Sequence, residues 1–249
     1  MNDVKEAINL SLVIPCYNES GRIELLYNGL ESFVKQWPAR FEIVIVNDGS
    51  KDDTWQKLQT HPFYKQHASN IKLINQENTG KGGALKHGVA QASGNFILTL
   101  DADMAAQPTE VIKWMDMLGW KPDERTIYIG SREHKASTII NEAFKRKLAG
   151  NVFNLIVRSL TPLKVNDSQC GFKLYSNRAG KQLFSELETN GWAHDVELLY
   201  RGQMHGMFIK EMPLTWEAIE GSKIRLLKDS IAMFNEILNI SKKIKRTKQ

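Results

Sequence analysis

The sequence predicts an α/β fold in which helices flank both faces of a mostly parallel central sheet. In the first half of the 249-residue chain, short apolar runs alternate four times with amphipathic helical stretches. Strand and helix units in series form parallel sheets, because the crossover helices pack onto the sheet. Polar and acidic residues follow three of the apolar runs, at the edge where such sheets bind ligands. The pattern therefore predicts both the fold and the location of the site.

Each of the four units has a strand-length run of apolar residues followed by a helical pattern. In the first unit, Ile23, Leu26, Leu30 and Phe33 recur at three- and four-residue steps, which gives the helix one apolar face. The strand and helix of the four units are expected at residues 10–15 and 20–36, 42–46 and 52–58, 71–74 and 83–91, and 95–100 and 108–118.

The second half of the chain has less regular patterns. A fifth strand is expected at residues 126–130, and Phe144, Leu148 and Val152 lie on one face of a helix expected over 138–160. The remaining elements are expected as a strand or turn at 167–176, helices at 179–187 and 196–201, a strand at 208–216 and an amphipathic helix from 223 to a basic tail.

The charge of the chain is concentrated at its end. Lys and Arg number 33 and Asp and Glu 28, a net charge of +5, and one segment accounts for all of it. We call residues 242–248 the basic tail; its cations are Lys242, Lys243, Lys245, Arg246 and Lys248. A nucleic-acid-binding module is therefore the weakest of the functions considered, since the rest of the chain is neutral. The tail and its helix predict contact with an anionic membrane, or a helix packed on the core with a solvated tail.

The composition is that of an ordinary globular protein, with 42% hydrophobic and 24% charged residues, which excludes disorder and a disulfide scaffold. No apolar run approaches the ~20 residues that span a bilayer, and the first residues do not resemble a signal peptide. We therefore expect a cytoplasmic protein, peripheral at a membrane face, in which Cys16 and Cys170 are free thiols.

Two carboxylates follow the fourth predicted strand, at Asp101 and Asp103. Burial of the strand does not explain them, and oxygen ligands suit Mg²⁺ or Mn²⁺, which in turn bind a substrate diphosphate. The alternative is a solvated turn in which Asp103 caps the next helix. Asp48, at the end of the second strand, fits either a turn or hydrogen bonds to a nucleobase or ribose. The stretch 78–83 matches no phosphate-loop pattern, although a Lys81 contact with a nucleotide is compatible with it.

Eight stretches, in order, resemble known enzymes. The first four resemble the nucleotide-sugar half of family 2 glycosyltransferases with the Rossmann-like GT-A fold: Pro15-Cys-Tyr-Asn-Glu19, Asn47-Asp-Gly-Ser50, Gly80-Lys-Gly82 and Asp101-Ala-Asp103. The other four resemble dolichyl-phosphate β-glucosyltransferases and, more loosely, dolichyl-phosphate mannose synthases: Gly130-Ser-Arg132, Asp167-Ser-Gln-Cys-Gly-Phe-Lys173, Trp192-Ala-His-Asp-Val-Glu-Leu-Leu-Tyr200 and Trp216-Glu-Ala-Ile-Glu-Gly-Ser-Lys223. The resemblance covers residues 10–225.

The resemblance implies a single catalytic domain over residues 1–222, with a nucleotide-sugar half at 10–118 and an acceptor half at 126–222, followed by the amphipathic helix and tail at 223–249. It implies Mg²⁺ or Mn²⁺ on Asp101 and Asp103. The nucleotide-sugar residues that it implies are Pro15, Tyr17, Asn18, Glu19, Asp48, Lys81, Asp101 and Ala102. Two positions depart from the family pattern: Ala105 replaces a common Gln, so the metal needs another ligand, and Asn47 replaces an Asp.

The resemblance also implies which residues face the reaction and the acceptor. Asp195, Arg132, Lys223 and Asp167 are expected to be catalytic, with Arg132 and Lys223 on the leaving group. The expected acceptor residues are Gln169 and Lys173 and, apart from the resemblance, Arg146. The alternative for Asp167, Gln169 and Lys173 is turn formation and an exposed strand, which explains Lys173 equally well, and the alternative for Arg146 is a solvated helix residue.

The expected reaction is inverting, metal-dependent transfer of glucose from UDP-glucose to a polyprenyl phosphate. A phosphate with a second pKa of ~6 is already ionised and needs no strong base. A saccharide hydroxyl, the acceptor in the alternative reaction, needs a carboxylate such as Asp195.

Overall fold

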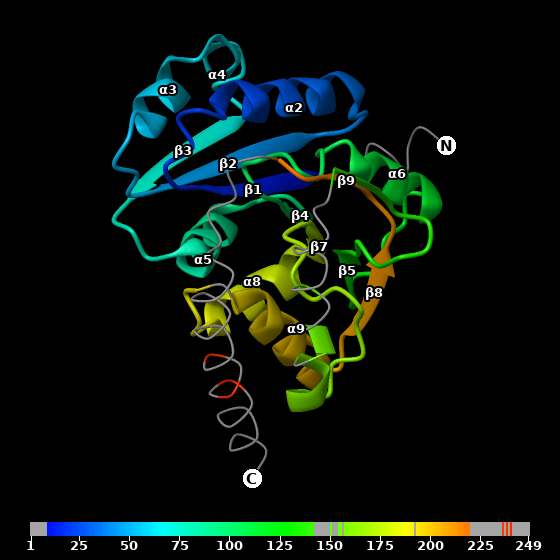
Figure 1. Ribbon diagram of the computed structural model, residues 1–249. Helices are drawn as coiled ribbons and strands as arrows, with labels where there is room; N and C mark the ends of the chain where they lie inside the picture. Colours follow the sequence, from blue (N-terminus) through cyan, green and yellow to red (C-terminus); the bar gives the residue numbers. More distant parts are fainter. Residues whose placement is uncertain are drawn as a thin grey trace.

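The computed structural model describes residues 9–141, 150, 154–155, 157–191, 193–219, 236, 238 and 240. A seven-stranded sheet runs through it in the order β3-β2-β1-β4-β7-β5-β8 (Figure 1). Its strands are β1 (Leu10–Cys16), β2 (Phe41–Asp48), β3 (Ile71–Gln76), β4 (Phe96–Thr99), β5 (Thr126–Gly130), β7 (Lys173–Ser176) and β8 (Phe208–Met212). β7 pairs antiparallel with β4 and β5, whereas the other neighbours are parallel, which confirms the mostly parallel sheet.

Helices cover both faces of this sheet, as the sequence predicts (Figure 1). They are α2 (Ile23–Gln36), α3 (Thr54–Thr60), α4 (Pro62–Gln66), α5 (Lys81–Gln91), α6 (Glu110–Met117), α8 (Asn177–Glu186) and α9 (His194–Met204). α2, α3, α4 and α6 contribute to the core on one face, and α5, α8 and α9 to the core on the other.

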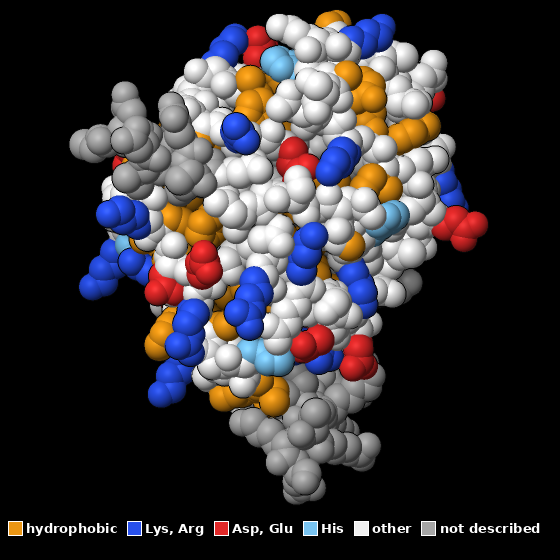
Figure 2. Space-filling view, turned by 180° about the vertical axis from the view of Figure 1, so that it is seen from behind, with side chains coloured by type: hydrophobic (Ala, Val, Ile, Leu, Met, Phe, Trp, Pro, Cys, Tyr) orange, Lys and Arg blue, Asp and Glu red, His pale blue; other side chains and the backbone are white. Residues whose placement is uncertain are grey.

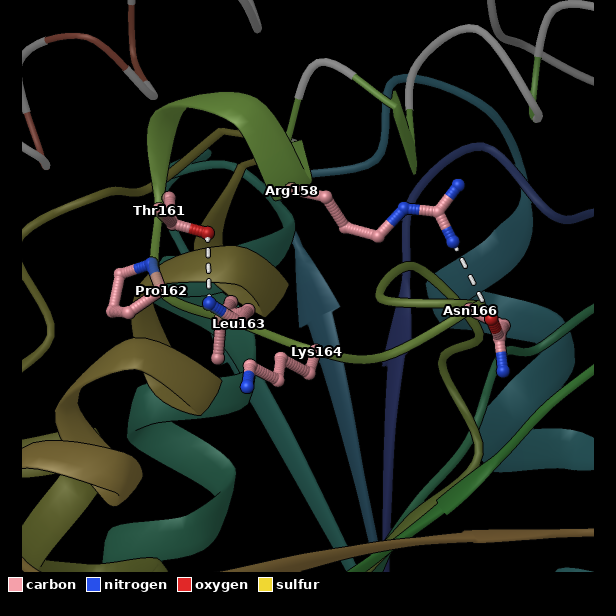
Figure 3. A pocket seen from close by; sticks show the side chains of 6 residues that line it. All are labelled: Arg158, Thr161, Pro162, Leu163, Lys164 and Asn166. Atoms are coloured by element: carbon pink, nitrogen blue, oxygen red, sulfur yellow. Dashed lines mark hydrogen bonds between the residues drawn. The ribbon is translucent and has the colours of Figure 1, made fainter.

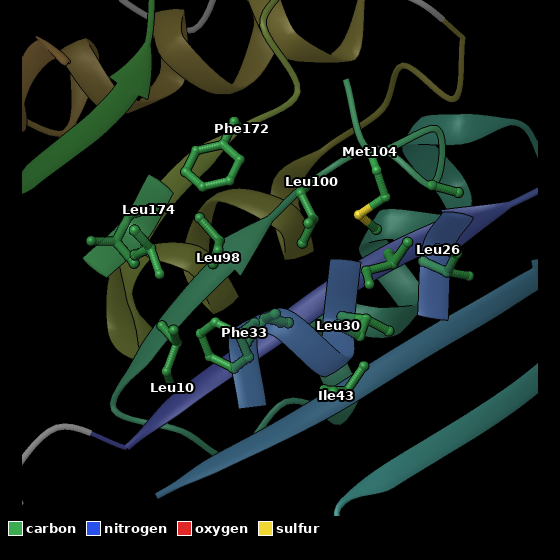
Figure 4. Close-up of a cluster of buried hydrophobic side chains, with 14 of the residues drawn as sticks. Leu10, Leu26, Leu30, Phe33, Ile43, Leu98, Leu100, Met104, Phe172 and Leu174 are labelled. Carbon is green, nitrogen blue, oxygen red and sulfur yellow. The ribbon is translucent and has the colours of Figure 1, made fainter. Parts of the chain in front are cut away.

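Strand periodicity explains the two cores. Along β2, Ile43 and Ile45 point into the core that contains α2, while Val44 and Val46 point into the core that contains α5. Figure 4 shows the first of these cores, where Leu30 of α2 and other apolar side chains pack between helix and sheet. α2 ends at Gln36 because Trp37 is extended and precedes Pro38, which disfavours a helical conformation at Trp37.

Two expectations for the second half are wrong in detail. The helix expected over 138–160 does not include residues 138–140, because Thr138–Ile140 forms strand β6, which pairs parallel with β9 (Thr215–Glu217). β-branched residues fit a strand, and a partner was not visible in the sequence. The strand expected at 208–216 is divided into β8 and β9, which belong to different sheets. Pro213 lies between them and has no N–H to donate to a ladder.

The predicted C-terminal helix is described at three residues only. Glu236, Leu238 and Ile240 are helical, and Ile240 is buried in the core that contains α5 and α9. The predicted domain boundary at 222 and the basic tail lie outside the described residues. Within the described ranges, the structure contains no helix with the length and apolarity needed to cross a membrane.

Candidate active site

The ends of β1 and β2 are tied together by hydrogen bonds between the segments that follow them. The backbone N–H of Asn18 donates to Ser50 Oγ at 2.9 Å, and the Asn18 side chain accepts from the Lys51 N–H at 2.8 Å. Asn18 has φ of 52°, in the left-handed region that Asn tolerates better than most residues. Glu19 pairs with Arg22 at 2.6 Å. Two of the segments singled out in the sequence therefore form one surface at the carboxyl end of the sheet.

Asp48 is buried and fully engaged by the turn that follows β3. One carboxylate oxygen accepts from Gln76 Nε2 and from the Thr79 N–H, each at 2.8 Å, and the other accepts from the Gly80 N–H at 2.9 Å. These bonds fix the turn immediately before Lys81, the first residue of α5. A direct contact between Asp48 and a nucleotide stays a prediction, and the observed contacts give Asp48 a role in holding this turn.

Asp101 and Asp103, which we call the carboxylate pair, follow β4. Lys81 Nζ lies 2.6 Å from Asp101 Oδ1, and Asp103 Oδ1 accepts from the Ala105 N–H at 3.1 Å. Burial and the negative charge of Asp101 raise the pKa of Asp103. A divalent cation relieves this repulsion, so these oxygens fit a hard metal ion. Among the described residues, no group of three or more His, Cys, Asp and Glu side chains is arranged to hold a metal.

Gly171 brings the loop before β7 against Asp101 of the carboxylate pair. A Cβ atom at this position would lie 2.6 Å from both carboxylate oxygens of Asp101, a distance that no side chain tolerates. The backbone of the segment 167–173 therefore lies directly against Asp101 only because residue 171 is a glycine.

Arg132 and Asp167 form a forked ion pair beside this loop. Arg132 Nε and Nη2 donate to the two Asp167 oxygens at 2.7 and 2.9 Å, and the Arg132 backbone N–H also donates to Asp167 at 3.0 Å. Burial favours the neutral acid, but the interactions with Arg132 outweigh it and lower the pKa of Asp167. The Arg132 guanidinium also lies 5.5 Å from the ring centroid of Trp216.

A second, deeper ion pair joins Lys173 of β7 to Asp195 of α9. Lys173 is fully buried, and its ammonium group donates to Asp195 Oδ1 at 2.5 Å and to the Cys170 carbonyl. His194 Nε2 lies 3.4 Å from the other Asp195 oxygen. Burial opposes ionisation of Asp195, but the interactions with His194, Lys173 and Lys81 prevail and lower its pKa to about 2. Burial also lowers the pKa of His194.

Comparisons with known proteins identify the family of the chain. The sequence pattern described as glycosyl transferase family 2 matches residues 11–184. The chain belongs to glycosyl transferase family 2. It is 36% identical over 250 residues to the dolichyl-phosphate beta-glucosyltransferase of Saccharomyces cerevisiae, which covers 94% of this chain and 75% of the yeast protein. It is 35% identical to the human protein of that name, over 86% of this chain and 69% of the human one.

Solved structures share the fold of this glycosyltransferase. Glucosyl-3-phosphoglycerate synthase from Mycobacterium tuberculosis, in a complex with Mn²⁺, UDP-glucose and phosphoglyceric acid, matches with a TM-score of 0.71. The match covers 97% of this chain and 82% of the synthase, at 17% identity. This likeness confirms the predicted GT-A architecture, and the sequence relatives confirm that the chain is an enzyme, a glycosyltransferase.

The remaining predicted residues of the glycosyltransferase divide into three groups. Pro15, Tyr17 and Gln169 are partly exposed near the groups described above, whereas Ala102 is buried. Arg146 and Lys223 lie outside the described residues, so their expected contacts stay predictions. Lys173 is enclosed by its own chain, and a direct acceptor contact by Lys173 also stays a prediction, because its ammonium group is engaged with Asp195 and Cys170.

A cavity of about 490 Å³ opens next to Asp167 (Figure 3). Its lining residues are Arg158, Thr161, Pro162, Leu163, Lys164 and Asn166. Arg158 Nη1 donates to Asn166 Oδ1 at 3.3 Å, and Asn166 directly precedes Asp167 in the chain. The cavity thus combines two cationic side chains with apolar ones.

Proposed function

We propose that this glycosyltransferase moves glucose from UDP-glucose to a dolichyl-type polyprenyl phosphate, with inversion at the anomeric carbon. The names of its sequence relatives support the donor sugar and the lipid acceptor. The observation that carries the proposal is the Lys173–Asp195 pair. With its pKa lowered to about 2, Asp195 is a weak base, whereas a phosphate acceptor needs no base.

The donor binds at the carboxyl end of the sheet. Asp101 and Asp103 would hold Mg²⁺ or Mn²⁺, which supplies positive charge to the diphosphate leaving group when it is bound. The structural relative that was solved with Mn²⁺ and UDP-glucose supports this choice of ion. Lys81, held by the turn that Asp48 fixes, provides a further cation within reach of the diphosphate. Partly exposed Pro15, Tyr17 and Glu19 contribute the nucleotide side of the site.

The acceptor phosphate approaches from the segment 130–173. One of its oxygens attacks the anomeric carbon and forms the new C–O bond, while the bond to UDP breaks and its electron pair departs with the diphosphate. The acceptor is already ionised at neutral pH, so no side chain takes a proton. The forked pair with Asp167 holds Arg132 in place. The cavity with Arg158 and Lys164 supports an acceptor that is both anionic and apolar.

We propose that the enzyme acts as a peripheral protein at a membrane surface, with the basic tail on anionic lipid. Nucleic acid is a poor alternative partner. On the face shown in Figure 2, Lys and Arg side chains of the described part are scattered, with Asp and Glu side chains between them. A saccharide acceptor is the second enzymatic alternative, and it requires Asp195 to leave its ion pair and accept a proton.

A panel of nucleotide sugars tests the proposal. Purified enzyme is incubated with Mn²⁺ or Mg²⁺, one of UDP-glucose, UDP-GlcNAc or GDP-mannose, and a short polyprenyl phosphate. We expect a glucosylated lipid from UDP-glucose, and its loss in Asp103→Asn and after chelation of the metal. Failure of every donor to give a lipid-linked sugar contradicts the proposal.

A further inference from the structure

Helix α9 carries His194 and Asp195 at its beginning, but the residue at its N-cap has no capping side chain. That residue is Ala193, which provides no oxygen for the free N–H groups of the first turn. Alanine is among the poorer N-cap residues for this reason. The helix that holds the buried Asp195 therefore depends on another part of the chain for its N-terminal partner.

Glu236 of the C-terminal helix is this partner. Glu236 Oε2 accepts a hydrogen bond from the Ala193 N–H at 3.2 Å. A Cβ atom at residue 191 would lie 2.5 Å from Glu236 Oε1, so the carboxylate in this position uses the space that Gly191 leaves open. A negative charge at a helix N-terminus also interacts favourably with the helix dipole. Ile240, one helical turn further on, is 5% exposed and packs in the same core as α9, which secures the contact.

The segment before α9, which Glu236 contacts, is also joined to the beginning of α5. The Gly82 N–H of α5 donates to the Asn190 carbonyl at 2.9 Å, which joins the helix that begins with Lys81 to the segment before α9. His194 Nδ1 lies 2.8 Å from the Gly191 carbonyl. A carboxylate that fixes residues 191–193 thus fixes Asp195 relative to both Lys173 and Lys81.

We propose that Glu236 is a positioning residue, which caps α9 from the C-terminal helix and so holds His194 and Asp195 in register with the rest of the site. The basic tail begins at Lys242, just beyond this contact. Glu236 therefore lies six residues before the segment that we propose to contact lipid.

The test compares Glu236→Ala and Glu236→Gln with Glu31→Ala in the full-length enzyme. Glu31 lies on the exposed side of α2 and forms an ion pair with Lys35, so its replacement by alanine also removes one carboxylate but far from α9. The first measurement is amide hydrogen exchange of residues 190–197, which requires no substrate. We expect faster exchange in Glu236→Ala, a smaller increase in Glu236→Gln, which keeps an acceptor oxygen, and no change in Glu31→Ala.

The second measurement is kinetic and rests on the proposed function. We expect kcat for glucose transfer, per folded enzyme, to fall about three- to tenfold in Glu236→Ala, since Asp195 interacts with Lys81, the cation proposed for the diphosphate, and small displacements of such groups have large effects on rate. The KM for UDP-glucose should change less than twofold, and Glu236→Gln should recover most of kcat. Unchanged exchange in each variant that folds, or a lower Tm with wild-type kcat, overturns the positioning role. If no variant or wild type transfers glucose, the proposed function fails, and the exchange measurement alone decides this inference.

Discussion

The Lys173–Asp195 pair illustrates how burial determines what a side chain does. Each partner is nearly inaccessible, with exposed side-chain fractions of 0% and 7%. Removal of one partner leaves the other charge buried without its ion-pair partner, whereas removal of both takes away the two charges together. Lys173→Met or Asp195→Asn alone should therefore reduce the free energy of unfolding by about 3–5 kcal/mol.

The double variant should lose less free energy of unfolding than the two single variants lose together, because the two residues interact directly. Denaturant unfolding of all four proteins measures the coupling. Strict additivity would show that the pair contributes nothing to stability beyond its two separate side chains.

Activity separates the two acceptor alternatives at the same residue. If a lipid phosphate is the acceptor, folded Asp195→Asn should retain partial transfer, because no proton has to be removed. With a saccharide acceptor the same variant should lose transfer almost completely. Initial rates with each acceptor, corrected for folded protein, distinguish these outcomes.

At the scale of elements, the loop from Asp167 to Lys173 lies close to the carboxylate pair at Gly171. Gly171→Ala places a Cβ atom against Asp101 and should displace that carboxylate. We expect Mn²⁺ to stimulate the variant only at higher concentration, and transfer to fall by about tenfold or more. The control is Gly21→Ala, since residue 21 has open space around it. The measurement is transfer activity as a function of Mn²⁺ concentration. If Gly171→Ala showed the same dependence on Mn²⁺ as the wild type, the proposed contact between the loop and the metal site would be contradicted.

Sequence patterns predicted the elements that local forces determine. The apolar run of β2 and the apolar face of α2 identified both correctly, because the local pattern matches the burial of these elements. Strand β6 was predicted as helix, because its three residues become a strand only by pairing with β9, which lies far away in the sequence. Long-range pairing of this kind leaves no local signal.

The sequence singled out the residues of the candidate site more readily than the contacts that their side chains make. Motif resemblance identified Asp48, Asp101 and Asp195 as important residues. It did not reveal that Asp48 holds a turn or that Lys173 neutralises Asp195, because both roles depend on burial and on partners from other elements. Gly171 lay within a quoted motif and carried a usable signal, whereas Glu236 carried none.

At the scale of the whole molecule, Glu42 links strands at the end of the sheet opposite the site. It accepts from Ser11 Oγ at 2.6 Å and from Ser93 Oγ at 2.8 Å, and it pairs with Lys72 at 2.8 Å. Burial opposes ionisation of its carboxyl group, but the hydrogen bonds from Lys72, Ser11 and Ser93 prevail and lower the pKa of Glu42 to about 2.

A lowered pKa makes the stability of the enzyme depend on pH in a defined window. The folded state holds Glu42 ionised more strongly than the unfolded state does, so this stabilisation is complete above the ordinary pKa of 4.5 and is lost as pH falls toward about 2. Glu42→Gln should lower the free energy of unfolding at pH 7 by about 2–3 kcal/mol and approach the wild type near pH 2. Denaturant unfolding of both proteins between pH 7 and about pH 2 measures this difference in free energy. A constant difference between the curves would exclude Glu42 as the cause.

The basic tail adds a prediction about location. Deletion of residues 242–249 should weaken binding to liposomes that contain anionic lipid, because each basic residue contributes up to about 1 kcal/mol at such a surface. Glu236 and Ile240 remain in this variant, so donor hydrolysis in solution should be unchanged. Sedimentation with anionic and neutral liposomes tests this, and equal binding of the full and shortened chains would leave the tail a solvated end.

The central claim is that glucose passes to a lipid phosphate, and a competition between acceptors tests it most directly. Enzyme, Mn²⁺ and UDP-glucose labelled in the sugar are mixed with equal concentrations of a short polyprenyl phosphate and an oligosaccharide, and the label is followed into the organic and aqueous phases. We predict that the label enters the organic phase as a glucosyl phosphate lipid. Label found in the oligosaccharide, with none in the lipid, would contradict the claim.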